Sequence, residues 1–423
     1  MNKGIISYKI ISLNSILSRT KNEETVIVWG LSIRTKEILR KGAKVDFIID
    51  KNTEICGSNY DGIPIIPPTK LEELKEAKLF LCGNHIEEIL FNIQNLNLEN
   101  KIFILEEDLQ PYFKITKDYF DKNHSIESKK ELFKNLVKHI EIEPHSYCNR
   151  TCWFCPNSFI DRKRDVKLFD KEILIKLLNE LQTINYDGQI SFTRYSEPFG
   201  NNYFYEMLSI VKKSLPNSFL HANTNSDFLN NKTLQKAYDN GLRSLFVQIY
   251  LDKDEAFNFT NIDKKAQKII NLISDVKIEL DFIKDDWIEY KCIYKDMKIR
   301  MYARDFTVNG TNRAGLEIIK KKTVRTSPCF MVFTDIYIDY NGNIVPCCNI
   351  RSDNLLQKNY VIGNIQDYNS ILELYFCDNF LNWRKNLFNL ETKKIPPCLN
   401  CSFNIVQNSN LLANHLFTVN KSL

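Results

Sequence analysis

Short apolar runs alternate with longer segments of helical periodicity along much of the chain. Apolar runs of about four to six residues between helical segments are typical of parallel strands joined by crossover helices, because such strands are buried on both faces. The first series predicts a parallel sheet within residues 21–115, after an N-terminal extension of residues 1–20. Its strands are expected at TVIVWG (25–30), KVDFIID (44–50), KLFLCGN (78–84) and KIFILEE (101–107).

The first of these strands ends in a glycine turn of the kind at which Rossmann-type folds bind a nucleotide. Gly30 stands where the fingerprint Gly-x-Gly-x-x-Gly begins, but Ser32 and Thr35 replace the second and third glycines. Asp50 follows about twenty residues later, where such folds place a ribose-binding acid. We therefore expect a small Rossmann-type domain with Gly30 and Asp50 as candidate nucleotide-binding residues. A structural domain without a nucleotide is the alternative.

A second and larger series of strands follows a linker at residues 116–137. Six βα repeats fit a partial (β/α)6 barrel of the TIM type over residues 138–310, so the fold class is α/β. Such folds carry their chemistry on the loops after the C-terminal ends of the strands. The strands are expected at HIEIEP (139–144), QISFTRY (189–195), FLHANTN (219–225), LFVQIYL (245–251), VKIELDFI (276–283) and KIRMYARDF (298–306).

The composition is that of an ordinary globular protein of several domains, with 423 residues, 43% hydrophobic and 26% charged. A net charge of +5 from 57 basic and 52 acidic residues is too small to indicate nucleic-acid binding. No apolar run reaches the roughly 18 residues of a membrane helix. Lys9 and Asn14 interrupt the apolar N-terminus, which therefore does not resemble a signal peptide. We expect a cytoplasmic protein.

The twelve cysteines are expected to be free thiols, because a reducing compartment disfavours disulfides and clustered thiols there indicate metal binding or catalysis. Cys56, Cys82, Cys292 and Cys377 stand alone and are interpreted as small buried residues. The remaining eight form two groups, within residues 148–155 and 329–401.

The first group, Cys148, Cys152 and Cys155, directly follows the first strand of the predicted barrel. Thiolates are soft ligands that favour zinc, copper(I) or iron–sulfur clusters. His145 would complete a structural Cys3His zinc site, which needs four protein ligands. A cubane held by three thiolates would instead leave one iron open for a further ligand. The residue types alone leave both readings open.

The spacing Cys148-x3-Cys152-x-Phe154-Cys155 resembles the cluster loop of the radical S-adenosylmethionine (SAM) superfamily. The resemblance implies that the three cysteines hold a 4Fe–4S cluster whose fourth iron is chelated by the amino and carboxylate groups of SAM. It also implies that Phe154 lies against the adenine.

Two later motifs extend this resemblance. FTRYSEP (192–198) stands where the family has Gly-Gly-Glu-Pro, with Glu197 kept, and NTNS (223–226) resembles its Thr-Asn-Gly, with Asn225 kept. The resemblance implies that Glu197 receives the ammonium of SAM and that Asn225 faces its ribose or carboxylate.

The second group has two cysteines around a predicted hairpin, with Asn341-Gly342 as its turn, and two in PPCLNC. Its four candidate ligands, which would close a tetrahedral zinc or a cubane site, are Cys329, Cys347, Cys398 and Cys401. Neighbouring residues of an extended strand point to opposite faces, so we assign Cys347 rather than Cys348. Residues 311–423, with Gly342-x4-Cys347, IGNI, ILEL and Cys398-x2-Cys401, resemble the SPASM extension of radical SAM enzymes. This implies a small α+β domain with one auxiliary 4Fe–4S cluster.

The N-terminal segments VIVWG, VDFIIDKN and YDGIPIIPPTKLEEL resemble the nucleotide-sugar-binding domain of bacterial sugar O-acyltransferases. Together, the resemblances imply a radical SAM oxidoreductase that forms a 5′-deoxyadenosyl radical and oxidises a sugar or nucleotide-linked sugar in glycan biosynthesis. They also imply a flavodoxin or ferredoxin as electron donor. A peptide-modifying maturase and a non-catalytic metal-binding scaffold are the alternatives. No residue is assigned to catalysis beyond the ligands.

Overall fold

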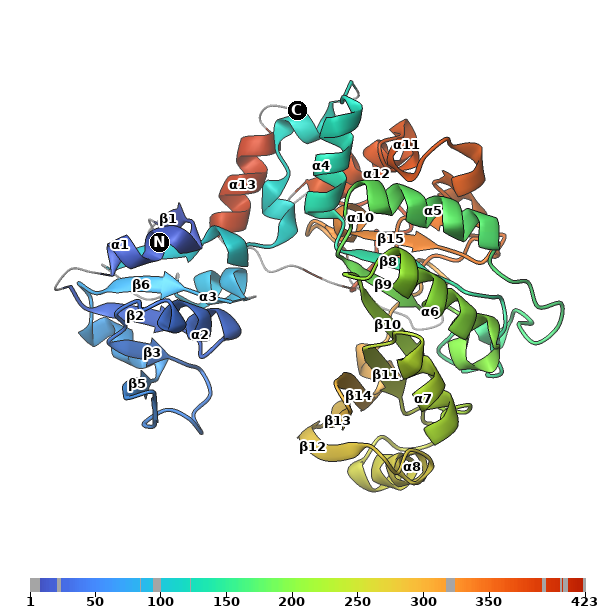
Figure 1. Cartoon of the computed structure of the whole chain (residues 1–423), viewed down its shortest axis with the longest axis horizontal. Coiled ribbons are helices and arrows are strands. Elements are labelled where there is room, and N and C mark those ends of the chain that lie inside the picture. Colours follow the sequence, from blue (N-terminus) through green and yellow to red (C-terminus); the bar gives the residue numbers. More distant parts are fainter. Residues whose placement is uncertain are drawn as a thin grey trace. The chain divides into compact units, whose positions relative to one another are not determined.

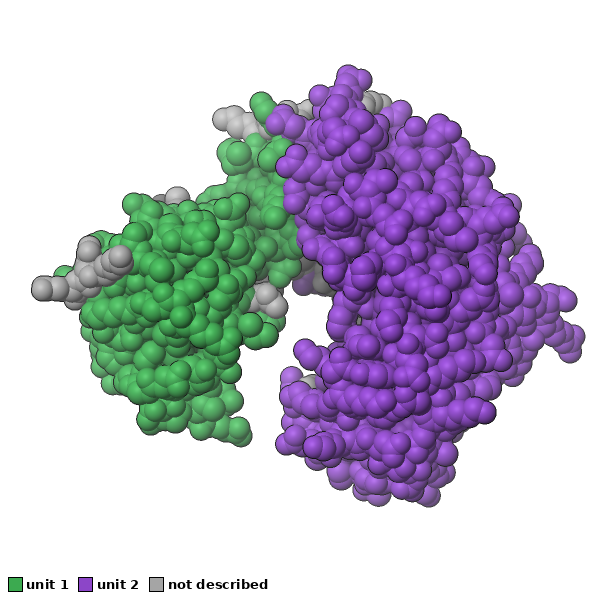
Figure 2. Space-filling view, viewed as in Figure 1, with its two compact units in different colours: residues 1–117, 406–423 green, residues 118–405 purple. Residues whose placement is uncertain are grey.

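The computed structural model describes residues 8–20, 24–83, 85–93, 100–121, 123–316, 324–389, 393–403, 405 and 410–420. The chain divides into two compact units (Figure 2). Unit 1 comprises residues 1–117 and 406–423, and unit 2 comprises residues 118–405. Each unit contains one large β-sheet.

The sheet of unit 1 has seven strands in the order β1-β7-β6-β2-β3-β5-β4, and all neighbours are parallel except β4 and β5 (Figure 1). All residues of β2 and β6 are buried, as expected of strands covered on both faces. The predicted parallel sheet is therefore confirmed. Its strands are β1 (Tyr8–Ile11), β2 (Val26–Trp29), β3 (Phe47–Ile49), β4 (Asn59–Tyr60), β5 (Ile63–Ile66), β6 (Lys78–Leu81) and β7 (Lys101–Leu105).

The helices of unit 1 include one from the far end of the sequence. They are α1 (Ile16–Arg19), α2 (Ile33–Arg40), α3 (Ile86–Ile93) and α13 (Asn410–Asn420). Leu411 of α13 is buried in the same apolar cluster as Ile86 and Leu90 of α3. This contact places α13 in unit 1, whereas the sequence assigned residues 311–423 to one domain.

The sheet of unit 2 has ten strands in the order β12-β13-β14-β11-β10-β9-β8-β15-β16-β17 (Figure 1). Six neighbouring strands, from β14 through β15 in this order, are parallel. The strands are β8 (His139–Ile142), β9 (Gln189–Phe192), β10 (Phe219–Thr224), β11 (Ser244–Gln248), β12 (Lys277–Lys284), β13 (Trp287–Tyr294), β14 (Met297–Arg304), β15 (Asp335–Ile338), β16 (Asn343–Val345) and β17 (Gly363–Asn364). The predicted hairpin around Gly342 is confirmed by the antiparallel pairing of β15 with β16.

An unpredicted strand, β13, lies between two expected strands and runs antiparallel to both. The prediction of a parallel βα repeat at 276–283 is wrong, because β12, β13 and β14 form an antiparallel meander. Two residues connect β12 to β13, and two connect β13 to β14. A parallel crossover needs about a dozen residues or more, so these short turns permit only hairpins. Lys295 has φ 56°, a left-handed conformation that suits a two-residue hairpin turn.

Most of the segment expected as a linker, residues 116–137, belongs to unit 2, which begins at residue 118, and its described residues are structured. It contains α4 (Ile126–Leu136), and Tyr119 and Phe120 pack their buried rings against Phe333. The other helices of unit 2 are α5 (Lys171–Thr183), α6 (Tyr203–Ser214), α7 (Asn231–Asp239), α8 (Phe259–Leu272), α9 (Phe306–Asn309), α10 (Met331–Thr334), α11 (Ile371–Tyr375) and α12 (Asp378–Phe388). Among the residues that the structure describes, none of the helices combines the length and the apolar character that crossing a membrane requires.

Candidate functional site

The C-terminal ends of the parallel strands in unit 2 surround one cavity of about 340 Å³. This arrangement is typical of parallel sheets, in which strand ends meet at one edge and carry the functional loops. Each of five strands contributes at its end: Cys148 follows β8, Glu197 follows β9, Asn225 follows β10, Tyr250 follows β11 and Arg304 ends β14. We call this space the open cavity.

The structure brings the three predicted cluster cysteines, Cys148, Cys152 and Cys155, together on the wall of the open cavity. A tight turn sets their spacing, because the amide of Cys155 donates to the carbonyl of Cys152 at 2.9 Å. Burial and the nearby Cys155 raise the pKa of Cys152 to about 12. The Cys152 thiol therefore keeps its proton until a metal centre displaces it. Three soft donors at one wall, facing an open space, fit a cluster that retains a position for another ligand.

His145, the candidate fourth zinc ligand, is fully buried and is not among the described residues lining the open cavity. Its Nδ1 accepts from the amide of Tyr147 at 3.2 Å, so Nε2 carries the proton and faces the carbonyl of Pro198 at 3.4 Å. Both ring nitrogens thus have backbone partners. In the described part of the chain, no three His, Cys, Asp or Glu side chains converge closely enough to share one metal ion.

Glu197 and Asn225, the predicted SAM contacts, are joined to each other at the cavity wall. Glu197 is 2% exposed, and its Oε2 accepts from the amide of Asn225 at 2.7 Å. Its Oε1 accepts from the hydroxyl of Thr224 at 2.6 Å. Burial raises the pKa of Glu197 to about 7 despite these donors. The side-chain amide of Asn225 donates from Nδ2 to Oδ1 of Asn149 at 2.9 Å, which links the cysteine loop to the end of β10.

Phe154, predicted to lie against adenine, belongs to an aromatic group at the cavity wall. Its ring stacks on Phe306 with centroids 3.5 Å apart and an interplanar angle of 3°. Tyr250 packs against the same ring at 5.1 Å. A flat apolar platform therefore stands beside the three thiols, and one face of Phe154 is already covered by Phe306.

The second cysteine group lines a separate small cavity, which we call the closed chamber. Its thiols are Cys329, Cys347, Cys398 and Cys401. Apolar side chains make up much of the remaining wall, among them Val332, Ile350, Trp383 and Leu387. Burial raises the pKa of Cys329 to about 11, and a hydrogen bond from Cys348 lowers that of Cys347. Four thiols inside an apolar wall fit a cluster ligated entirely by protein.

Cys347 and Cys348 are adjacent in sequence but line different cavities. Cys347 lines the closed chamber, whereas Cys348 lines the open cavity. The sequence argument for Cys347 assumes an extended strand, whereas both cysteines follow β16 in a bend and a turn, and their thiols are hydrogen-bonded to each other. The choice of Cys347 rather than Cys348 as a ligand stays a prediction. The wall between the two cavities therefore includes this pair of residues.

The candidate nucleotide-binding residues Gly30 and Asp50 belong to unit 1 and line neither cavity. Gly30 has φ +88°, which explains the glycine. Asp50 caps the turn, because Oδ2 accepts from the amide of Leu31 at 3.1 Å and Oδ1 from that of Asn52 at 2.9 Å. Both oxygens thus already have backbone donors.

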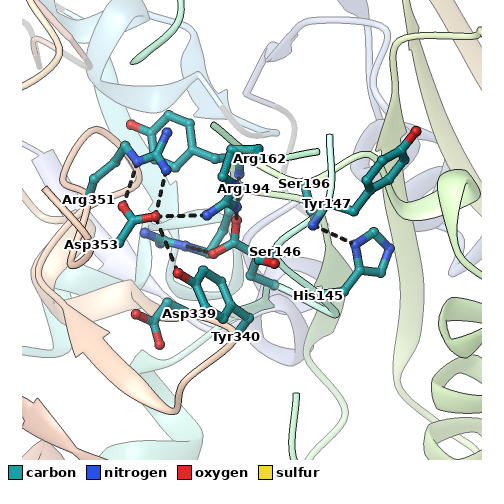
Figure 3. A network of polar contacts seen from close by, with 12 residues as sticks. His145, Ser146, Tyr147, Arg162, Arg194, Ser196, Asp339, Tyr340, Arg351 and Asp353 are labelled. Carbon is teal, nitrogen blue, oxygen red and sulfur yellow. Dashed lines mark hydrogen bonds and ion pairs between the residues drawn. The ribbon is translucent and has the colours of Figure 1, made fainter. Parts of the chain in front are cut away.

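A buried network of charges next to the open cavity was not found from the sequence (Figure 3). Arg351 pairs with Asp353 at 2.6 Å, Asp353 also pairs with Arg162 at 2.9 Å, and Arg162 contacts Glu143. Arg194 lies 3.8 Å from Glu143 and has the left-handed φ of 69°. The network links the strand before the cysteine loop to the segment after Cys348.

The sequence also missed several buried polar atoms without hydrogen-bond partners in residues that line the open cavity. They are Glu141 Oε1, Arg194 Nε and Nη1, Tyr195 OH, Arg304 Nε and Asn349 Nδ2. Buried polar groups are normally satisfied, so a group of them at one cavity indicates a polar ligand. Their position in the sequence could have indicated a role at the site, because Arg194, Tyr195 and Arg304 stand at the ends of predicted strands.

Residues 329–402 match the family model of SPASM, an iron–sulfur cluster-binding domain. The chain is 26% identical over 268 residues to the S-adenosyl-L-methionine-dependent 2-deoxy-scyllo-inosamine dehydrogenase of Niallia circulans, covering 63% of this chain and 93% of that protein. Similar solved structures include BtrN in complex with AdoMet and 2-DOIA (TM-score 0.45, 24% identity, 64% of this chain and 96% of that chain). Another is SuiB of Streptococcus suis bound to S-adenosylmethionine (TM-score 0.32, 12% identity, 63% and 71%).

The cysteine loop, the SPASM match and the likeness to this dehydrogenase agree on the class of protein. The chain is an oxidoreductase of the radical SAM class that uses SAM and 4Fe–4S clusters. The predicted SPASM extension is confirmed by the family match. The likeness of the N-terminal region to acyltransferase domains stays a prediction.

Proposed function

We propose that this enzyme oxidises an alcohol carbon of a sugar or a sugar-like cyclitol to a carbonyl. The observation that carries the proposal is the separation of two groups of thiols: the three thiols of one loop line the open cavity together with Cys348, and four other thiols line the closed chamber. Cys148, Cys152 and Cys155 would hold a cluster that leaves room for SAM. The chamber's four cysteines would hold an auxiliary cluster without an open position. When bound, SAM and the clusters supply the one-electron chemistry that removes a hydrogen atom and an electron from the substrate.

The chain's own residues would bind and orient the substrate in the open cavity. Tyr195 OH, Asn349 Nδ2 and Glu141 Oε1 are buried there without hydrogen-bond partners, although Glu141 Oε1 also lies 3.8 Å from Arg194. Hydroxyl groups of a sugar can donate to or accept from each of the three atoms. Glu141 Oε1 is also a site for the proton that an alcohol loses on becoming a carbonyl. Phe154 and Phe306 provide an apolar wall that excludes water.

The substrate class draws on the likeness to a dehydrogenase that acts on 2-deoxy-scyllo-inosamine. The finer assignments made from the sequence are proposals as well. These are the partial barrel at 138–310, the Rossmann-type domain with a nucleotide at Gly30 and Asp50, and Glu197, Asn225 and Phe154 as SAM contacts. A flavodoxin or ferredoxin donor and a cytoplasmic location complete the proposal.

The test is metal content and SAM cleavage of protein purified without oxygen. About eight irons with matching sulfide per chain are expected for two clusters. With dithionite, the enzyme should convert SAM to 5′-deoxyadenosine, and with its substrate it should give a product lighter by two hydrogens. Cys152→Ala should abolish 5′-deoxyadenosine formation and retain about four irons. Cys56→Ala, at a cysteine outside both cavities, is the control. Unchanged SAM cleavage in Cys152→Ala would refute the assignment.

A further inference from the structure

The charges around the open cavity are not balanced. Arg150 pairs with Asp227 at 2.5 Å, and Arg194 lies 3.8 Å from Glu141 and from Glu143. These side chains neutralise one another. Two further arginines line the same cavity, Arg304 and Arg313, and neither has an ion-pair partner in the described part of the chain.

Arg304 is held in place by packing rather than by charge. It ends β14, and its guanidinium lies over the ring of Phe306 at 4.6 Å. Its Nε is buried and has no hydrogen-bond partner. Burying an unpaired guanidinium is unfavourable unless a ligand supplies the missing contacts. Such a group is typical of a binding site for an anion.

Arg313 reaches the cavity from a strained loop. Arg313 and Ala314 have φ values of 47° and 54°, which place two consecutive non-glycine residues in the left-handed region. Such conformations are unfavourable for residues with a side chain and are concentrated at functional sites. The guanidinium makes two long contacts, from Nε to the carbonyl of Phe154 at 3.4 Å and from Nη1 to Oδ1 of Asn349 at 3.5 Å. Most of its donors therefore remain available.

The two guanidiniums lie close enough to affect each other, since burial and the neighbouring Arg313 lower the pKa of Arg304. SAM does not relieve this surplus of positive charge, because its sulfonium and ammonium outnumber its one carboxylate. A cluster ligated by thiolates is a net anion, so it neutralises the net positive charge of SAM. The positive charges of Arg304 and Arg313 are then not neutralised by SAM or the cluster, and the substrate is the remaining source of a negative charge.

We propose that the substrate carries an oxyanion, a phosphate or a carboxylate, that Arg304 and Arg313 bind together. Guanidinium forks match the paired oxygens of these groups and form strong charge-assisted hydrogen bonds. The inference rests on the proposed function and narrows its substrate to a phosphorylated, nucleotide-linked or acidic sugar. It separates this enzyme from the Niallia circulans dehydrogenase, whose named substrate is an amine. A protonated amine would be repelled by this pair.

Binding of radiolabelled inorganic phosphate and pyrophosphate to the anaerobic holoenzyme, measured by equilibrium dialysis with SAM present, tests the proposal. Arg304→Gln and Arg313→Gln should each weaken binding at least about tenfold. Arg243→Gln removes a charge that pairs with Asp296 outside the cavity and should leave binding unchanged. Arg304→Lys keeps the charge without the fork and should fall between the two.

Two outcomes would overturn the proposal. One is that neither anion binds, or that both bind equally well to the glutamine variants with full iron content. The other is that the glutamine variants lose affinity for SAM while phosphate binding persists, which would assign the arginines to the SAM carboxylate. SAM cleavage by the wild-type enzyme, measured on the same preparation, reports the proposed function separately. Cleavage without anion binding would leave that function standing and remove this inference.

Discussion

The open cavity and the closed chamber are built from the same ligand type but differ in the rest of their walls. The open cavity presents the three thiols of the cysteine loop and Cys348 beside arginines, carboxylates and polar atoms without hydrogen-bond partners. The closed chamber presents four thiols and a largely apolar wall. A cluster in the chamber would have its coordination completed by protein. A cluster in the open cavity would keep one position and a polar space for ligands. The residues around the thiols, and not the thiols alone, would thus decide whether a cluster binds SAM for catalysis or only transfers electrons.

The largest effect should come from the residues at which the two cavities meet. Cys347→Ala removes a thiol from the closed chamber, so we expect about four of eight irons to be lost while SAM cleavage persists. Cys348→Ala removes a thiol from the open cavity and should retain all eight irons. Iron and sulfide analysis beside 5′-deoxyadenosine measurement distinguishes the two. The reverse pattern of iron loss would assign Cys348 to the chamber and break the comparison.

Local signals were enough to predict the parts of both cavities that depend on neighbouring residues. A few consecutive residues are enough to identify the spacing of Cys148, Cys152 and Cys155, and the same holds for the hairpin turn at Gly342. The meander of β12, β13 and β14 was missed although its two-residue turns were visible, because the short apolar runs were read as parallel strands.

The polar wall of the open cavity was not predictable in the same way. Arg351 donates to Asn157, 194 positions earlier in the chain, at 2.6 Å. Such pairs depend on how strands are ordered in the sheet, which no local pattern encodes. Arg313 enters the cavity only because its backbone is left-handed, a conformation that sequence preference argues against for arginine.

The next largest effect concerns the buried charge network beside the open cavity (Figure 3). Asp353→Ala removes the carboxylate between Arg351 and Arg162, whose side chains are 1% and 3% exposed. Leaving buried charges unpaired should lower the free energy of unfolding by about 3–5 kcal/mol. Denaturant unfolding of the holoenzyme measures this loss.

An exposed ion pair provides the matched control for the network. Lys171 and Glu206 are 2.6 Å apart, with side chains 53% and 47% exposed. Glu206→Ala should cost less than about 1 kcal/mol, because water screens exposed pairs. Equal losses in Asp353→Ala and Glu206→Ala would contradict the idea that the network ties the cysteine loop to the segment after Cys348.

A smaller effect is expected at Glu197, on the open side alone. Glu197→Ala should weaken SAM binding about tenfold without loss of iron, since a carboxylate facing the cavity offers acceptors to a cation. Glu197→Gln keeps the size and one acceptor oxygen for the backbone amide of Asn225, and its NH2 group can donate to the Thr224 hydroxyl, so it should retain both links but weaken SAM binding similarly. Equilibrium dialysis and iron analysis provide the readouts. If iron leaves with either variant, Glu197 is structural.

The smallest effect is a pH dependence confined to the wall of the open cavity. His221 accepts from Ser244 at 2.9 Å and donates to Oδ1 of Asn223, a cavity residue, also at 2.9 Å. Burial lowers the pKa of His221 to about 4 from an ordinary value near 6.5. A depressed folded-state pKa means that the neutral histidine's stabilisation is complete above pH 6.5 and is lost as the pH falls toward 4.

Between pH 6.5 and 5.5, this loss should amount to about 1 kcal/mol in the free energy of unfolding. His221→Gln cannot take up a proton, so its unfolding free energy should change less over the same interval. Denaturant unfolding of both holoenzymes at the two pH values makes the comparison, with iron content as a check on the clusters. Parallel pH profiles for the wild type and His221→Gln would show that His221 does not set this dependence.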